Sequence, residues 1–210
     1  MSYQHIKFFS EVSLPDIPKV GGKNASLGEM YQNLTPKGIN LPNGFATTSD
    51  AYYYFIDQAG IRSKIEEVLD GLDIHNVRDL KVRGQKIRDI VERAKLPKDF
   101  EDEILEGYRE LSRQCGRKDV VVAIRSSATA EDLPNASFAG QQETYLNISG
   151  EKNVLKYAKK CIASLFTDRA IVYRVEKGFS HMQVALSVGV QQMVAVRSEA
   201  AGVMFTVDTE

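Results

Sequence analysis

Hydrophobic residues recur with the helical period through the first half of the chain. Apolar positions three and four residues apart predict several amphipathic helices. Thr48 or Ser49 can cap one of them at its start, and Gly116 ends the last. Gly84 is an expected weak point in one of them because glycine has a low helix propensity. We therefore predict a helix-rich lobe over residues 1–117. The apolar sets that define its helices lie at 27–34, 51–55, 61–72, 80–94 and 100–111.

The pattern changes after Asp119 to short apolar runs rich in β-branched residues. Val120–Ile124 predicts a buried strand, and the polar stretch Gly116–Asp119 is the best candidate for a boundary. The expected fold class is α/β, of the α+β type, in which a mainly antiparallel strand-bearing lobe over 118–210 follows the helical lobe. Further strands are expected at Glu143–Ile148, 184–194 and 202–207, the last two as a hairpin, with helices at 154–165 and after Thr167.

Residues 126–142 form a long segment of small and polar residues between two predicted strands. Loops of this length in compact domains are usually functional. Small side chains, with Gly140 near the end of the segment, leave backbone N–H groups that could close over a polyphosphate. The alternative is a surface excursion without a ligand.

Composition narrows the range of functions. The chain has 210 residues, of which 43% are hydrophobic and 26% charged, as is typical of a globular protein with a buried core. Its formal net charge of -1 argues against nucleic-acid or membrane-surface binding, so an anionic ligand would need a local site. The sequence contains no recognisable signal peptide or membrane-spanning run, and its two cysteines lie far apart. We expect a cytoplasmic protein without disulfides or structural zinc.

Gly21-Gly22-Lys23 lies just before the first predicted helix. Two glycines allow close backbone approach, while the free N–H groups and dipole of a helix N-terminus favour an anion. Lys23 adds a positive charge, which makes this turn a candidate phosphate site. It is not a Walker A motif, because the upstream glycine is missing and Asn24 stands where Ser or Thr should follow the lysine. An ordinary turn remains the alternative.

Two further polar residues lie beside or within predicted strands. Arg125 ends the first strand, where a guanidinium could bind phosphate oxygens; the alternative is an ion pair with Glu131 or Asp132. Gln191 interrupts an apolar strand, and an inward-facing amide could bind an adenine edge. Strand alternation could equally turn Gln191 to solvent and bring Gln192 inward.

The histidines suggest no catalytic or metal site. His5, His75 and His181 lack Ser, Cys or acidic neighbours at the spacing of a triad or a metal site. We expect them to be solvated or to cap helices. The sequence therefore predicts neither a catalytic residue nor a set of metal ligands.

Longer stretches of the chain resemble the N-terminal nucleotide-binding domain of the phosphoenolpyruvate synthase family. The resemblance is carried by VGGKNASLGEM, LPNGFATTSDAYYYF, AIRSSATAEDLPNASFAGQQETYLNI, ASLFTDRAIVYRVEKGFSH and GVMFTVDTE. It covers nearly the whole chain and weakens only over about 60–117. Pyruvate phosphate dikinase and rifampicin phosphotransferase are wider relatives with similar GGK and R-S motifs.

The resemblance implies the first part of an ATP-grasp-like domain that binds ATP with Mg²⁺. Such a domain passes a phosphoryl group to a histidine on a separate domain, and a barrel domain then forms phosphoenolpyruvate from pyruvate. The overall reaction consumes ATP, pyruvate and water and releases AMP and phosphate. Carried over by motif, Lys23 and Arg125 would contact the ATP phosphates, and Gln191 would approach the adenine. Gly140 and Thr144 would lie along the phosphate-covering loop and the strand after it.

Two parts that the family uses do not match this sequence. None of the three histidines lies in the Thr-Cys-His type of context that surrounds the family's phosphorylated histidine. The family also binds ATP and magnesium through an acidic residue, a Gln and an Arg. In the family these residues belong to the second half of the ATP-grasp domain, which follows the FTVD strand. We therefore expect this chain to be an incomplete portion of the enzyme, inactive by itself. The alternatives are the ATP-binding domain of a related phosphotransferase and a non-catalytic nucleotide-sensing module.

Overall fold

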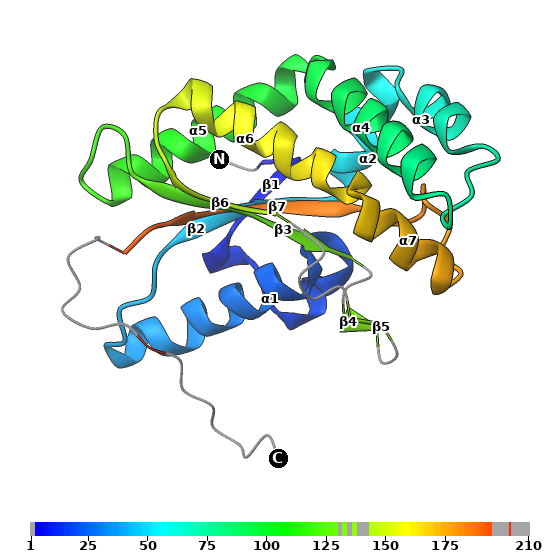
Figure 1. Cartoon of the computed structure of the whole chain (residues 1–210). Helices are drawn as coiled ribbons and strands as arrows, with labels where there is room; N and C mark the ends of the chain where they lie inside the picture. Colours follow the sequence, from blue (N-terminus) through cyan, green and yellow to red (C-terminus); the bar gives the residue numbers. More distant parts are fainter. Residues whose placement is uncertain (1–2, 130–131, 134–135, 138–142, 195–201, 203–210) are drawn as a thin grey trace.

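The computed structural model describes residues 3–129, 132–133, 136–137, 143–194 and 202. In these residues the chain forms helices packed on a five-stranded sheet (Figure 1). The helices are α1 Ile17–Leu34, α2 Ser49–Gln58, α3 Arg62–Leu69, α4 Val77–Arg93, α5 Lys98–Gln114, α6 Glu151–Ala163 and α7 Asp168–Glu176. The strands are β1 Ile6–Phe8, β2 Gly44–Thr47, β3 Val122–Ala128, β4 Asp132–Leu133, β5 Ala136–Ser137, β6 Thr144–Ile148 and β7 Leu186–Gln192.

The main sheet is antiparallel and has the strand order β1-β2-β7-β3-β6. Among its strands β7 comes last in the sequence, yet it lies between β2 and β3. Figure 1 shows α1 on one face of this sheet, with α4, α5, α6 and α7 over the opposite face. β4 and β5 pair with each other as a separate short ribbon.

Side chains alternate between the two faces of β3. Val122 and Ile124 are buried in the large core that the sheet shares with the helices of the opposite face. Arg125 and Ser127 therefore lie on the face toward α1. A smaller apolar cluster fills part of that side, formed by Phe9, Val12, Val20, Ala25 and Ala46. This smaller core leaves room for polar side chains between α1 and the sheet.

The helices expected from the apolar periodicity are confirmed. Thr48 caps α2, its side chain accepting a hydrogen bond from the Ala51 N–H at 3.1 Å. Thr167 caps α7 in the same way, accepting from the Ala170 N–H at 3.3 Å. The expected α+β fold class with an antiparallel sheet is also confirmed.

α4 runs unbroken through Gly84, the position whose low helix propensity predicts a weak point. A Cβ at this position would lie 2.8 Å from Asp168 Oδ1 and 3.1 Å from Arg88 Nη1. Arg88 donates to the Phe166 carbonyl oxygen at 2.7 Å and pairs with Asp168 at 3.3 Å. The missing side chain lets α4 pack closely against the start of α7, while the expected weak point stays a prediction.

Two expectations about strands need correction. β3 continues to Ala128, so Arg125 lies inside the strand rather than at its end, and 126–128 are not loop. Pairing with β7 along the whole of β3 supplies the hydrogen bonds that favour this longer strand. The apolar pattern also missed β1 and β2, whose 3 and 4 residues are too short to display a period.

Part of the predicted strand-bearing lobe lies outside the described residues. Gly140 and residues 203–207 fall there, so the phosphate-covering loop and the second hairpin strand stay predictions. The division of the chain at residue 117 also remains a prediction, and among the described residues strands from both sides of that position share the sheet. Of the helices in the described ranges, none has the length and apolar character that crossing a membrane requires.

Candidate functional site

The backbone of α1 leaves helical geometry at Gly21, where φ is 72° and ψ is 161°. A positive φ of this kind is readily adopted only by glycine. Gly21 also lies against β3, since a Cβ there would fall 2.7 Å from the Ser127 carbonyl oxygen and would also overlap the Ser127 hydroxyl. A regular helical stretch therefore begins at Gly22, with its N-terminus beside the sheet. Such a terminus offers unpaired N–H groups to an anion.

Asn24 anchors this helix start to the centre of the sheet. Its side chain is 2% exposed, and its Nδ2 donates to the Val20 carbonyl oxygen at 3.1 Å and to Ser187 Oγ at 2.9 Å. The Ser187 hydroxyl in turn donates to the Thr47 carbonyl oxygen at 2.6 Å. Gly189 makes room for the amide, because a Cβ there would lie 3.2 Å from Asn24 Cγ. The kinked segment is thereby held on β7.

Lys23 and Arg125 line the same cavity, which has a volume of about 370 Å³. The other lining residues come from α1 and are apolar or small, and none carries a carboxylate. Two positive charges beside a helix N-terminus favour a ligand with several negative oxygens. The structure thus brings together two candidates that are about a hundred positions apart in the sequence.

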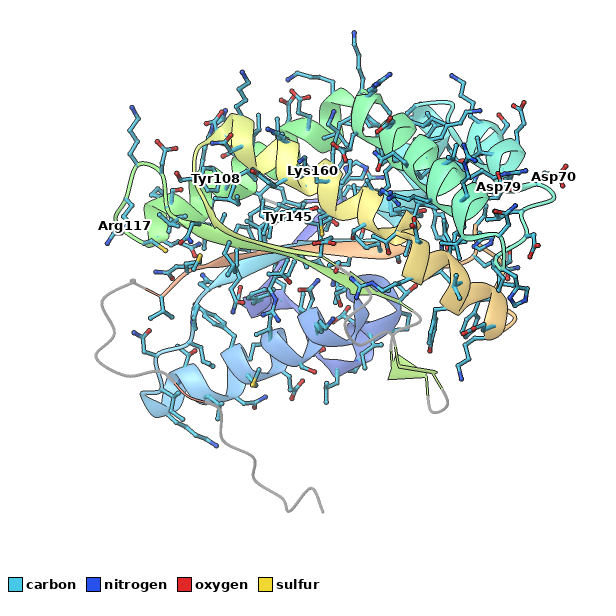
Figure 2. The ribbon with its side chains drawn as sticks, viewed as in Figure 1. Asp70, Asp79, Tyr108, Arg117, Tyr145 and Lys160 are labelled. Atoms are coloured by element: carbon cyan, nitrogen blue, oxygen red, sulfur yellow. The ribbon has the colours of Figure 1, made fainter. Side chains whose placement is uncertain are left out.

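Strand register places Thr144 and Gln191 on the same face as Arg125. Arg125 pairs with Thr144 on β6 and with Gly189 on β7, and Gln191 follows two positions along β7. Directly paired residues and alternate residues of one strand share a face. Figure 2 shows Tyr145 on the opposite side, beneath α6, where its ring centroid lies 5.0 Å from that of Tyr157. The neighbouring Thr144 therefore faces α1.

Gln191, rather than Gln192, lies on the α1 face. It is half-buried, and its Nε2 reaches the Pro42 carbonyl oxygen at 3.4 Å. At that distance the bond is weak, so the amide retains hydrogen-bonding capacity for a ligand. Gly140, the remaining candidate, lies outside the described residues.

Arg125 forms no ion pair with a side chain in the described part of the chain, and its guanidinium borders the cavity instead. Glu131 and the side chain of Asp132, the two acidic partners weighed from the sequence, lie outside what the structure describes. The half-buried guanidinium is thus placed for an anionic ligand.

None of the three histidines lines the cavity. His75 is exposed, as expected, but His5 is 4% exposed and lies 3.3 Å from the Glu103 carboxylate. His181 accepts a hydrogen bond from Arg174 Nε at 3.0 Å through Nδ1. Burial, and then the positive charge of Arg174, lower the pKa of His181 to about 4. The expectation of solvated or capping histidines is therefore wrong for His5 and His181, which have specific partners in the fold.

Sequence reasoning missed the residues that hold the cavity together. In the sequence Asn24 stands out only as a departure from a nucleotide-binding motif, and Ser187 and Gly189 occupy ordinary positions of a predicted strand. The signal is the run of polar or small residues at the alternate positions 187, 189 and 191 of this strand. Such alternation indicates that one face of the strand packs against polar groups of a neighbouring element.

Comparison with known proteins adds the family. Residues 17–210 match the model of the pyruvate phosphate dikinase AMP/ATP-binding domain. The chain is similar to phosphoenolpyruvate synthase of Helicobacter pylori, with 54% identity over 99% of this chain and 26% of that protein. The corresponding enzyme of Aquifex aeolicus is 53% identical over 98% of this chain and 24% of its own length.

A third relative carries a similar name and a similar level of identity. The probable phosphoenolpyruvate synthase of Methanocaldococcus jannaschii is 50% identical over 99% of this chain and 17% of its own length. The chain therefore spans only about a quarter or less of these relatives. Because the family model covers nearly the whole sequence, the chain belongs to the pyruvate phosphate dikinase AMP/ATP-binding domain family.

Proposed function

We propose that this chain is the N-terminal ATP-binding part of a phosphoenolpyruvate synthase. The observation that carries the proposal is the cavity shared by Lys23 and Arg125 beside the N-terminus of a helix. Family membership and identities near 50% to proteins named phosphoenolpyruvate synthase support it.

In this proposal the ATP phosphates lie between Lys23 and Arg125. The helix that starts at Gly22 offers backbone N–H groups to the same oxygens. Thr144 would border the phosphates from β6, and the loop containing Gly140 would cover them. Gln191 would meet the adenine end, since it lies on the same face but farther along β7 from Gly189, the partner of Arg125.

A transferred phosphoryl group needs charge neutralisation and positioning more than covalent help from the protein. Lys23 and Arg125 would supply both, and the half-buried Arg125, held within β3, would cost little reorganisation during transfer. The accepting histidine and the pyruvate site would belong to other domains of the full-length protein. The complete reaction would form phosphoenolpyruvate, AMP and phosphate from ATP, pyruvate and water.

Magnesium would accompany the nucleotide, but the residues around the cavity do not form a site for it. Across the described ranges, no group of three or more His, Cys, Asp or Glu side chains is placed to hold a metal ion. Mg²⁺ in such enzymes is usually held by phosphates and one or two carboxylates.

Calorimetric titration of the full-length protein with ATP and with adenosine tests the binding mode. Lys23→Ala and Arg125→Ala should each weaken ATP binding about tenfold or more, because each removes a charged partner of the phosphates. Adenosine, which has no phosphate, should bind the variants as it binds the parent protein. Lys81→Ala, on the exposed side of α4, is the matched control. Equal losses for ATP and adenosine would contradict the assignment.

Product analysis tests the reaction itself. AMP formation beyond one equivalent per protein should require pyruvate, and phosphoenolpyruvate should accumulate in an amount equal to this sustained AMP. AMP formation that requires inorganic phosphate, or an acceptor other than pyruvate, would instead indicate one of the related phosphotransferases. Binding of ATP without any transfer would indicate a nucleotide sensor.

A further inference from the structure

A second large hollow lies on the opposite side of the sheet from the nucleotide cavity. Its volume is about 990 Å³, and it is bounded by the C-terminal end of α4, the connection to α5, the first turns of α5 and one side of α6. We call it the basic groove. In Figure 1 these helices lie over the face of the sheet away from α1, so the groove is separate from Lys23 and Arg125.

The basic groove carries an excess of positive charge. Six of its lining residues are Lys or Arg and two are Glu, in a chain whose overall formal charge is -1. Two of these lysines already have partners within the fold. Lys98 pairs with Asp102 at 2.7 Å, and Lys159 donates to the Glu92 and Ala94 carbonyl oxygens at 2.7 and 3.2 Å, which caps the end of α4.

Three lysines of the groove have no such role. Lys95, Lys152 and Lys156 are exposed, and none has a carboxylate partner in the described part of the chain. Lys156 lies 5.6 Å from the centre of the Tyr157 ring, and this cation–π contact brings no negative charge to the amine. Lys152 and Lys156 are four residues apart on α6 and therefore project from the same side of that helix.

The floor of the groove is apolar. Ala94, Leu96 and Leu155 line it and are partly buried against the main core. An apolar centre with a charged rim is the usual anatomy of a protein–protein interface. A free polyphosphate would match the rim but would gain nothing from the floor. A protein segment with acidic and apolar side chains matches both.

We propose that the basic groove docks an acidic amphipathic segment from the part of the full-length protein beyond residue 210. This inference rests on one part of the proposed function, namely that the chain is the N-terminal part of a longer protein. The relatives support that length, because the matching region is 24–26% of the bacterial proteins. Charge complementarity supports the occupant, since opposite charges across an interface fix its register and exclude wrong partners.

Zero-length cross-linking of the full-length protein with a carbodiimide tests the docking. The reagent joins a lysine amine to a carboxylate only when the two are in contact. We expect Lys95, Lys152 or Lys156 to be joined to Asp or Glu residues beyond position 210 of the same chain. A mixture of isotopically light and heavy protein separates links within one chain from links between copies. Lys64 and Lys81, exposed lysines of α3 and α4, are the internal controls.

The outcomes divide cleanly. Links within one chain to carboxylates beyond residue 210, absent at the control lysines, support the proposal. Links between light and heavy chains would overturn it in favour of a second copy. Groove lysines that stay unlinked, or that link only to nearby carboxylates such as Glu101, would overturn it altogether.

A charge-reversal variant gives an independent reading. Lys152→Glu with Lys156→Glu should lower the yield of the Lys95 link about tenfold, because like charges then face each other across the interface. Lys64→Glu with Lys81→Glu should leave that yield unchanged. ATP affinity should be the same in both double variants, so a failed docking model is distinguishable from a failed nucleotide assignment. An unchanged Lys95 link in the groove variant would overturn the proposal.

Discussion

The side chain of Asn24 packs directly against Gly189, and there is no room between them for a side chain on Gly189. A Cβ on Gly189 would lie 3.2 Å from Asn24 Cγ and would overlap its Oδ1. Through this contact the start of the Lys23 helix is seated directly on β7. The fit between the two residues therefore links the stability of the sheet to the geometry of the proposed nucleotide site.

Gly189→Ala should destabilise the protein by about 1–3 kcal/mol, because the added methyl displaces the Asn24 amide from its partners. Asn24→Ala should cost a similar amount by removing the buried hydrogen bonds to Val20 and Ser187. The double variant should cost clearly less than the sum, since the alanine at 189 then meets a small side chain. Urea denaturation of the four proteins measures this coupling, and strictly additive losses would contradict the proposed contact.

Gly21→Ala should be more damaging than Gly38→Ala. Both glycines have positive φ, at 72° and 83°, so both substitutions strain the backbone. Only Gly21 also faces a neighbour, Ser127, whereas nothing lies within 4 Å of a Cβ at Gly38. We expect the free energy of unfolding to fall by about 2 kcal/mol more for Gly21→Ala, with weaker ATP binding. Equal losses in both variants would mean that the approach of α1 to β3 carries no energetic weight.

Residues 1–210 expressed alone should show no turnover of ATP with pyruvate. The cavity offers cations for binding, but none of the three histidines in the sequence lines it as an acceptor. Incubation with labelled ATP, Mg²⁺ and pyruvate should yield no AMP above a protein-free blank. Heat-treated protein controls for carried-over activity. Steady AMP formation by the pure chain would refute the assignment of the acceptor to another domain.

In the full-length protein, Arg125→Ala should lower kcat by about two orders of magnitude or more. The loss corresponds to about 3 kcal/mol, as for other preorganised groups that stabilise charge developing in a transition state. Arg113→Ala, on the exposed side of α5, is the control because it removes a similar charge away from the cavity. Unchanged kcat and kcat/KM for Arg125→Ala would reduce this residue to a structural role.

Stability should fall as the pH drops from about 6.5 to about 4. The folded pKa of His181 is about 4, below its ordinary value of 6.5, so in this interval the unfolded chain binds a proton that the folded chain does not. Partial exposure of the ring limits the effect to about 1–2 kcal/mol, present in full above this interval and lost below it.

His181→Gln should flatten that pH dependence. Its amide oxygen can still accept from Arg174 Nε but does not titrate. Thermal unfolding at several pH values compares the variant with the parent protein. A parallel decline in the two proteins would exclude His181 as the cause.

The sequence predicts those parts of the fold that neighbouring residues determine, and it misses those that depend on residues far apart in the chain. The helices were predictable because their apolar spacing and their caps, such as Thr48, are local. The extent of β3 was not, because Arg125 to Ala128 become a strand only by pairing with β7, which lies about sixty residues later. Short strands such as β1 display too little pattern to be recognised.

The candidate site likewise combines features that local sequence predicts with features that depend on distant contacts. Lys23 and Arg125 were predictable as isolated phosphate-binding candidates, since the GGK turn and the strand-borne arginine are local features. Their shared cavity was not, because it depends on the seating of α1 by Asn24 against Ser187 and Gly189. Those side chains carry no charge or motif, and only the sheet order brings them together.

The central place of β7 also sets an order of assembly. β1 and β2 pair with each other, as do β3 and β6, but β2 and β3 meet only through β7. During synthesis the two strand pairs must therefore wait until residue 192 has left the ribosome. The same insertion delivers Ser187 and Gly189 to Asn24, so the start of the Lys23 helix is seated on the sheet only after β7 has been made. The cavity that Lys23 and Arg125 share therefore reaches its described form only once β7 is in place, and a nascent chain that stops before β7 lacks this seating of α1.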